Sequence, residues 1–348
     1  MAYQINEQLV HWLNEHALDL DQSNQHADAL LAQLSKAQLF GLGVPSASGG
    51  IPNTTLHDAA WAIAEVAKHS LSAAFVLWAQ RSFISYLVLH PNAPLSASLM
   101  TQALQGEIAG ATGLSNAIKF IGGVEGLQVK ATADGADWII DGYLPWVSNL
   151  AADSFHVMVA VERPNLPPAV LVLNHADVGL VRNDDLALHC IQGSNTASIK
   201  ITQCRVPANR IMAEDAAEFI RVVRPQFLAL QSALSTGVAL RCLSQVSAHQ
   251  RISATVREQV QQQQARIIAI QNELCTGAED GTFLNAPAAL FALRIELAKL
   301  CQDASLLELQ TEGGACFLQG LRDQTQRRVR EALFLPMVSP SISQLQLA

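Results

Sequence analysis

The sequence predicts an α+β protein with three parts: an N-terminal all-α domain, a small central β-barrel or β-sandwich domain, and a C-terminal antiparallel helical bundle. Three observations predict this order. Apolar residues recur at helical spacing up to about residue 105, alternate with polar residues from 106 to 212, and return to helical spacing from 213 to 348. We therefore expect domains at 1–105, 106–212 and 213–348.

Composition limits what such a chain can do. Its 348 residues are 50% hydrophobic and 15% charged, which is enough to bury a large core. Lys and Arg number 22 against 30 Asp and Glu, a net charge of −8, so nucleic-acid binding is not expected. The low charge instead favours burial of some surface in a homo-oligomer. The N-terminus shows no export signal and the apolar runs are short, so we expect a cytoplasmic protein without membrane insertion.

The N-terminal part has two helical features separated by a break. Leu9, Trp12 and Leu13 recur at helical spacing near the start. A Gly/Pro/Ser-rich segment at 41–50 interrupts the pattern. From Leu56 to about Leu89 the chain is apolar on nearly every side, which predicts one long buried helix.

The central part is predicted as short strands. Leu127, Val129 and Ala131 alternate with polar residues, the period of a half-buried strand. Asp134-Gly135 and Asp141-Gly142 are typical of hairpin turns. Other segments share this strand-like pattern: Phe155–Val161, Ala169–Leu173 and Ile199–Val206. Short strands at this spacing favour a barrel or sandwich over a βαβ sheet.

The C-terminal part contains long helical segments with few Gly or Pro residues. They are Phe227–Gln250, Ser253–Leu274 and Ala286–Leu318, and a loop is expected at Cys275–Asn285. Long helices joined by short connections predict an antiparallel bundle.

Several familiar sites are not expected. The six cysteines form no C-x-x-C pair, so we predict reduced, buried thiols and no zinc site. Gly41-x-Gly43 follows a helical segment instead of a strand, which argues against a dinucleotide-binding turn. His11 and His16 are five residues apart, so with Glu15 they diverge around a helix. No metal site is predicted.

Trp146 and Ser148 are the residues most indicative of a ligand. They lie two apart on a predicted strand, and therefore on one face. An indole beside a hydroxyl suits a flat heteroaromatic cofactor, which needs a surface to pack on and a polar contact. A barrel-core tryptophan has the same spacing, so this pattern alone leaves both interpretations open.

The order of the three parts resembles the acyl-CoA dehydrogenase family of flavoproteins over nearly the whole chain. Six segments, in the family's order, carry the resemblance: Leu39 to Gly50, Gly110-Ala111-Thr112, Gly142-Tyr143-Leu144-Pro145-Trp146-Val147-Ser148-Asn149, Gly193 to Ile211, Gln310-Thr311-Glu312-Gly313-Gly314, and Arg327-Arg328-Val329-Arg330-Glu331. The family implies an FAD cofactor, an acyl-CoA-like substrate, a homodimer or homotetramer, and an electron-transfer partner.

The resemblance also implies roles for particular residues. Arg224, before Pro225, matches an arginine beside the substrate. Arg251 stands where the family has Arg-x-x-Phe on the FAD pyrophosphate, although the aromatic residue is missing here. The residues implied to contact FAD are Thr112, Trp146, Ser148, Arg251, Gln310, Gly314, Ser341 and Gln344.

The family's catalytic glutamate is missing. The two positions where members of the family carry it are Val223 and Ser339 here, and neither side chain can abstract a proton. Glu312 and Glu331 are the nearest acids in sequence, and we expect them to form surface or ion-pairing contacts. Three functions therefore remain open: an FAD-dependent oxidoreductase with a displaced base, a flavin-dependent monooxygenase, or a non-catalytic binding or assembly homologue.

Overall fold

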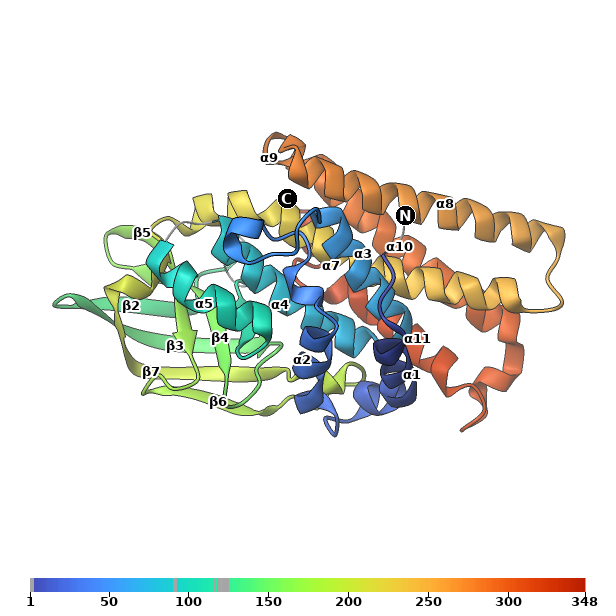
Figure 1. The fold of residues 1–348 in the computed structure, drawn as a ribbon, viewed down its shortest axis with the longest axis horizontal. Helices are drawn as coiled ribbons and strands as arrows, with labels where there is room; N and C mark the ends of the chain where they lie inside the picture. Colours follow the sequence, from blue (N-terminus) through green and yellow to red (C-terminus); the bar gives the residue numbers. More distant parts are fainter. Residues whose placement is uncertain (1–2, 90–92, 116, 118–119, 121–124, 348) are drawn as a thin grey trace.

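The computed structural model describes residues 3–89, 93–115, 117, 120 and 125–347. Figure 1 shows the β strands at one end of the molecule and the long helices at the other. Helix α4 (Leu71–Leu89) lies between them and packs on both β1 (Ala109–Gly113) and α7 (Ala216–Ala248). This arrangement confirms the predicted α+β fold class.

The other N-terminal helices pack around α4. They are α1 (Glu7–Gln22), α2 (Ala27–Lys36), α3 (Leu56–His69) and α5 (Ala93–Gln105). The single helix predicted over Leu56–Leu89 is wrong, because Ser70 adopts an extended conformation that ends α3. The Ser70 hydroxyl then accepts a hydrogen bond from the backbone N–H of Ala73, at 3.3 Å, in the first turn of α4. Apolar periodicity continues through such a break, so the pattern did not reveal it.

The strands form an eight-stranded sheet in the order β6-β7-β3-β2-β4-β5-β8, with β1 paired to β4. Besides β1 they are β2 (Val129–Asp134), β3 (Asp137–Val147), β4 (Phe155–Arg163), β5 (Leu166–Asn174), β6 (Leu180–Asp185), β7 (Ala197–Pro207) and β8 (Ile211–Ala213). The sheet encloses its own apolar core, which includes Ile140, Val157 and Leu171.

One of the two predicted hairpin turns is confirmed. Asp134 and Asp137 pair across the β2–β3 turn, as Asp134-Gly135 indicated. Asp141-Gly142 is not a turn: both residues lie inside β3, beside a register shift. A Cβ added at Gly142 would lie 2.5 Å from the carbonyl oxygen of Gln128, so this glycine permits a close approach of backbones.

The C-terminal helices are α7, α8 (Ala254–Glu279), α9 (Thr282–Asn285), α10 (Pro287–Glu312), α11 (Asp323–Phe334) and α12 (Ile342–Leu345). Helix α7 begins earlier than predicted, because Asp215 caps it by accepting from the N–H groups of Ala217 and Glu218. Much of the loop predicted at Cys275–Asn285 is helical, in the last turn of α8 and in α9.

Helices from both ends of the chain share one apolar core, which joins α3, α4, α7 and α10. Helices α4 and α7 are long and apolar enough to cross a membrane, but 94% and 83% of their membrane-length windows are buried inside the protein. They are accordingly core helices. The six cysteines are free and buried, as the sequence predicted.

Candidate functional site

The buried side chain of Gln80 connects α4 to β1 and to the end of β3. Its Oε1 accepts from the N–H of Gly110 (2.7 Å) and from Nδ2 of Asn149 (3.0 Å). Its Nε2 donates to the carbonyls of Ala103 and Ile108. Asn149 also donates to the Gly110 carbonyl, at 2.9 Å. These bonds fix the end of β3 against β1 and the helix.

Strand β1 and the end of β3 run side by side in opposite directions. Gly110 is bonded to Asn149, and a Cβ added at Gly113 would lie 3.1 Å from Cδ1 of Leu144. In this alignment of the two strands, Thr112 of β1 lies opposite Trp146 of β3. The structure therefore brings together two of the residues implied to contact a flavin.

Thr112 points away from the β core and toward the helices. Its Oγ1 lies 3.1 Å from the hydroxyl of Tyr86 on α4. The Tyr86 ring in turn contacts Phe219 and Phe227 of α7, at centroid distances of 5.7 and 6.5 Å. Burial raises the pKa of Tyr86, so its hydroxyl stays protonated and can donate.

Trp146 is 46% exposed, although it is a large aromatic residue. A register shift between Leu144 and Val147 turns Trp146 outward, while both of these neighbours pack into the β core. Within the described part of the chain, no ring contact or hydrogen bond engages the indole. One aromatic surface is thus left uncovered at the end of β3.

Ser148 is buried just beyond the strand. Its Oγ lies 2.7 Å from Oγ1 of Thr196, which lies 2.7 Å from Oγ of Ser194. Sequence reasoning missed this chain of hydroxyls, because Ser194 and Thr196 precede β7 and are distant in sequence. No carboxylate is hydrogen-bonded to Thr112 or Ser148 among the residues described here.

Arg224 lies in the third turn of α7, next to the buried Val223. Its guanidinium carbon stands 5.2 Å from the centroid of the Phe291 ring, a cation–π contact. Its Nε is buried and has no hydrogen-bond acceptor in the described part of the chain. Burial, with a smaller contribution from Arg221, lowers the pKa of Arg224 below its ordinary value. A positive charge is therefore held where an anionic group could meet it.

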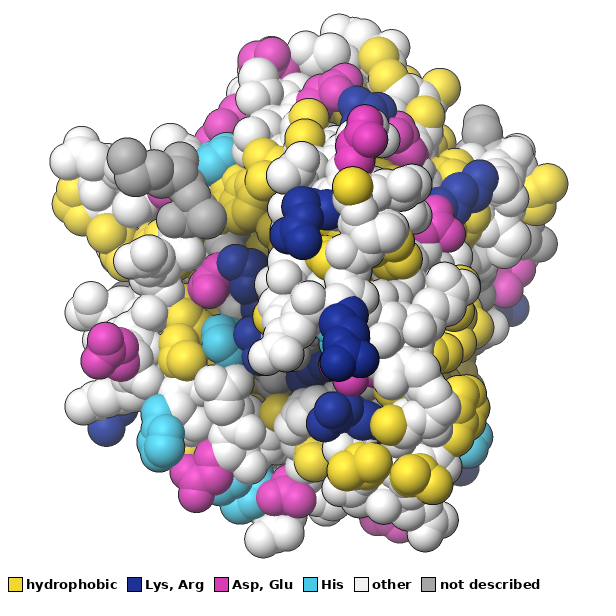
Figure 2. Space-filling model, turned by 90° about the vertical axis from the view of Figure 1, so that its right-hand side faces the viewer, with side chains coloured by type: hydrophobic (Ala, Val, Ile, Leu, Met, Phe, Trp, Pro, Cys, Tyr) yellow, Lys and Arg dark blue, Asp and Glu magenta, His cyan; other side chains and the backbone are white. Residues whose placement is uncertain are grey.

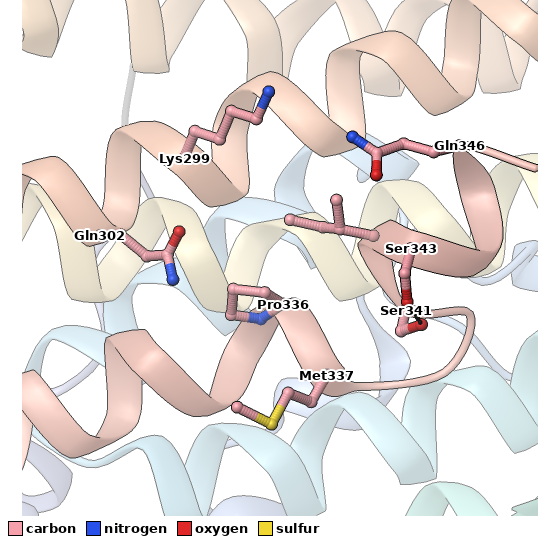
Figure 3. Close-up of a pocket in the computed structure, with 8 residues that line it drawn as sticks. Lys299, Gln302, Pro336, Met337, Ser341, Ser343 and Gln346 are labelled. Atoms are coloured by element: carbon pink, nitrogen blue, oxygen red, sulfur yellow. Dashed lines mark hydrogen bonds between the residues drawn. The ribbon is translucent and has the colours of Figure 1, made fainter.

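Ser341 lines a groove of about 590 Å³ between α10 and the C-terminal segment. Figure 3 shows Lys299 and Gln302 on one wall, with Ser341, Ser343 and Gln346 on the other. Gln344 has a different role, because its Oε1 accepts from the backbone N–H of Ser341 and caps α12.

Ser339, at one of the two family positions for the base, is hydrogen-bonded to the helical bundle. Its carbonyl accepts a hydrogen bond from Nε2 of Gln231 on α7, at 2.9 Å. Oε1 of Gln231 accepts from the buried Arg294. The structure therefore holds the C-terminal segment against α7, with a non-acidic residue at this position.

Arg251, Gln310 and Gly314 lie at the other end of the bundle. Arg251 is in the α7–α8 connection, and Gln310 and Gly314 are at the end of α10, all exposed. Figure 1 shows that connection at the end of the helices remote from the β strands. The structure thus separates these residues from Thr112 and Trp146 within one chain.

This far end of the bundle carries positive charge. Figure 2, which faces it, shows Lys and Arg side chains gathered down its middle. Sequence reasoning did not single out Arg241, two turns before the end of α7. Its guanidinium forms no hydrogen bond or ion pair within the described residues. Burial, followed by nearby Arg328 and Arg327, lowers its pKa.

Glu312 and Glu331 are both paired, as expected. Glu312 Oε2 accepts from Nε of Arg322, at 2.9 Å. Glu331 is fully buried, and its Oε1 accepts from Arg327 (2.6 Å) and from the N–H of Leu71 (3.2 Å). Burial raises the pKa of Glu331. Both carboxylates therefore hold helices together.

No family model matches the chain. A probable acyl-CoA dehydrogenase of Mycobacterium leprae, fadE25, is 25% identical over 207 residues, which are 59% of this chain and 53% of that protein. A probable acyl-CoA dehydrogenase of Bacillus subtilis, YngJ, is 26% identical over 211 residues, with 59% and 54% coverage. The matches thus span about half the length of these curated relatives.

Solved structures resemble the chain over its whole length. Butyryl-CoA dehydrogenase from Megasphaera elsdenii superposes with a TM-score of 0.81 at 17% identity, covering 100% of this chain and 98% of that one. The structure described as PigA with FAD and proline gives 0.78 at 16% identity, with 99% and 97% coverage. At these identities the likeness shows the fold alone.

Proposed function

Because the chain belongs to the acyl-CoA dehydrogenase family, we propose that it is an FAD-dependent oxidoreductase acting on a CH–CH group of an acyl-CoA or related substrate. One observation carries the proposal beyond the fold. The uncovered indole of Trp146 lies level with the hydroxyl of Thr112, on a strand that matches the family's flavin-contacting segment. An apolar ring exposed in this way suits a flat cofactor.

The residues at this end of β3 fit the ring portion of FAD. Trp146 would pack against one face of the isoalloxazine. The hydroxyls of Thr112 and Ser148 keep hydrogen-bonding capacity beyond their contacts with Tyr86 and Thr196, since each hydroxyl has one donor and two acceptor sites. When bound, FAD would supply the hydride acceptor that no amino-acid side chain provides.

The remainder of the substrate site is defined by charge. No described residue accepts from the Nε–H of Arg224, which lies beside the Phe291 ring, so this group can donate to a carbonyl or an anionic substrate group. No acid stands at either family position for the base, since Val223 is buried and aliphatic and Ser339 is hydroxylic. Abstraction of an α-proton by this chain is accordingly expected to be slow.

The end of the bundle that carries Arg251 and Gln310 fits the phosphate groups of FAD. Arg241 and Arg251 carry guanidinium groups, and a Cβ added at Gly314 would meet no atom within 4 Å, so an outside group can approach the backbone. Because this end is remote from Trp146 in the same chain, it would serve the FAD of a second subunit. We therefore propose a homodimer or dimer of dimers, in the cytoplasm, with an electron-transfer partner.

The test is FAD binding by matched variants. Purified protein should show flavin absorption bands and bind one FAD per chain. Trp146→Ala should weaken binding by about tenfold, the value of one stacked aromatic pair. Tyr143→Ala should not, although Tyr143 is 44% exposed on the same strand. Equal affinities of wild type and Trp146→Ala, or no flavin uptake at all, would contradict the proposal.

A further inference from the structure

Two histidines and an aspartate lie close together at the turn between α1 and α2. His16 and Asp19 lie about one turn apart on α1, and His26 stands immediately before the first residue of α2. One potential ligand atom from each of the three side chains lies within 4.8 Å of the others. Spacing along a single helix could not reveal this group, because the turn after α1 brings His26 back over His16.

Among the residues that the structure describes, neither the His16 nor the His26 ring forms a hydrogen bond. His26 occupies the N-cap position of α2, but its side chain makes no capping hydrogen bond. His16 makes no hydrogen bond to any described residue. Within the described ranges, the one charged contact of these two rings is between Nε2 of His26 and Oδ2 of Asp19, at 3.6 Å, which is longer than a hydrogen bond. Ring nitrogens and a carboxylate are therefore free to bind a ligand together.

The two rings are held close by packing. Their centroids are 4.0 Å apart, with planes inclined at 34°. The indole of Trp12 packs edge-on against both rings, at centroid distances of 5.0 Å from His16 and 6.4 Å from His26. The rings are partly buried, so the indole limits their rotation. Little side-chain entropy remains to be lost when the nitrogens bind a common ion.

The backbone around the three residues is anchored. The carboxylate of Asp21, at the end of α1, is fully buried and pairs with Arg330 of α11. Nδ2 of Asn24, in the turn, donates to Oδ2 of Asp185 on β6, at 3.0 Å. The α1–α2 joint thus connects the N-terminal helices to both the bundle and the sheet. A cross-link at this joint would stabilise all three parts.

Two imidazole nitrogens and one carboxylate oxygen are ligands of divalent transition metals such as zinc. Calcium and magnesium prefer oxygen ligands alone. Tetrahedral ligand atoms around zinc lie about 3.3 Å apart, so small side-chain rotations from the present positions would suffice. We propose that His16, Asp19 and His26 bind one divalent transition-metal ion, typified by Zn²⁺, with water completing its coordination.

The proposal is tested on the full-length, tag-free chain and does not depend on the flavin. Titration with Co²⁺ should give the visible absorption of a histidine-bound ion at one equivalent, and Zn²⁺ should abolish that absorption. Zn²⁺ should also raise the unfolding temperature. His16→Asn and His26→Asn should each weaken Co²⁺ binding at least tenfold, and Asp19→Asn, which keeps the shape of the side chain, should weaken it as well.

His11→Asn is the matched control. His11 is on the same helix but is 85% exposed, and its contact is with Glu15, at 3.8 Å. This variant should bind Co²⁺ as the wild type does. The proposal is wrong if the wild type shows no histidine-type absorption with Co²⁺. It is equally wrong if a folded His26→Asn or Asp19→Asn variant keeps wild-type affinity.

Discussion

At the scale of single residues, two buried arginines differ in whether a described residue accepts a hydrogen bond from the guanidinium group. Arg81 on α4 and Arg294 on α10 are 2% and 1% exposed, and burial lowers the pKa of each to about 10. Arg294 donates to Oε1 of Gln231 (3.1 Å) and to the carbonyl of Leu335 (3.0 Å). Arg81 forms no hydrogen bond or ion pair with any described residue, and its Nε and Nη1 are buried.

We expect Arg81→Met to raise stability. An unpaired buried charge pays a desolvation cost with no compensating contact, so an apolar side chain of similar length should stabilise the fold by about 1–4 kcal/mol. Arg294→Met should destabilise it by about 1–3 kcal/mol, because the acceptors Gln231 and Leu335 would lose their donor. Urea denaturation of both variants measures the difference. Equal destabilisation by the two substitutions would show that Arg81 has an acceptor after all.

Val223 permits a gain-of-function prediction at the same scale. General-base catalysis contributes on the order of 10²–10⁴ in rate. Val223→Glu places a carboxyl group at a family position for the base, and should accelerate anaerobic bleaching of bound flavin by butyryl-CoA within that range. Val223→Gln has the same shape without a base, and should bleach as slowly as the wild type. Rapid bleaching by the wild type would reveal a base elsewhere in the chain.

At the scale of elements, the sequence indicated where helices and strands lie better than where they stop. The long helix predicted over Leu56–Leu89 divides at Ser70, since apolar periodicity does not register one extended residue. Asp141-Gly142 has the composition of a turn, but close contact with the neighbouring backbone explains its glycine. In both cases tertiary contacts, which local spacing does not contain, decide the outcome.

The contact between α3 and α7 depends on another glycine. A Cβ added at Gly237 of α7 would lie 2.6 Å from the Cβ of Ala67 and would clash with the carbonyl oxygen of Ala64, both on α3. Gly237→Ala should therefore separate the helices and lower stability by about 1–3 kcal/mol, despite the better helix propensity of alanine. Gly314→Ala, where nothing lies within 4 Å, should change stability by less than about 0.5 kcal/mol. Chemical denaturation distinguishes the two.

At the scale of the whole molecule, the order of the three parts was predictable because hydrophobic periodicity changes clearly near residues 106 and 213. The arrangement of the site was not. Thr112 and Trp146 are level because Gln80 bonds both Gly110 and Asn149, a contact between three separate elements. Likewise, the distance of Arg251 and Gln310 from β3 follows from the direction of the bundle helices, which spacing along the chain cannot give.

That separation leads to a prediction about assembly. Beyond α10, Phe317, Leu318 and Leu321 are 76%, 60% and 51% exposed, next to the basic end of the bundle. Exposed apolar groups of this size favour burial against another surface, and a second subunit would also bring Trp146 to the phosphate-binding end. We expect light scattering at micromolar concentration to show a dimer or tetramer.

Phe317→Asp should weaken both assembly and FAD binding, whereas Val178→Asp, at a 90% exposed residue between β5 and β6, should affect neither. A wild-type monomer that still binds FAD would mean that each chain completes its own cofactor site.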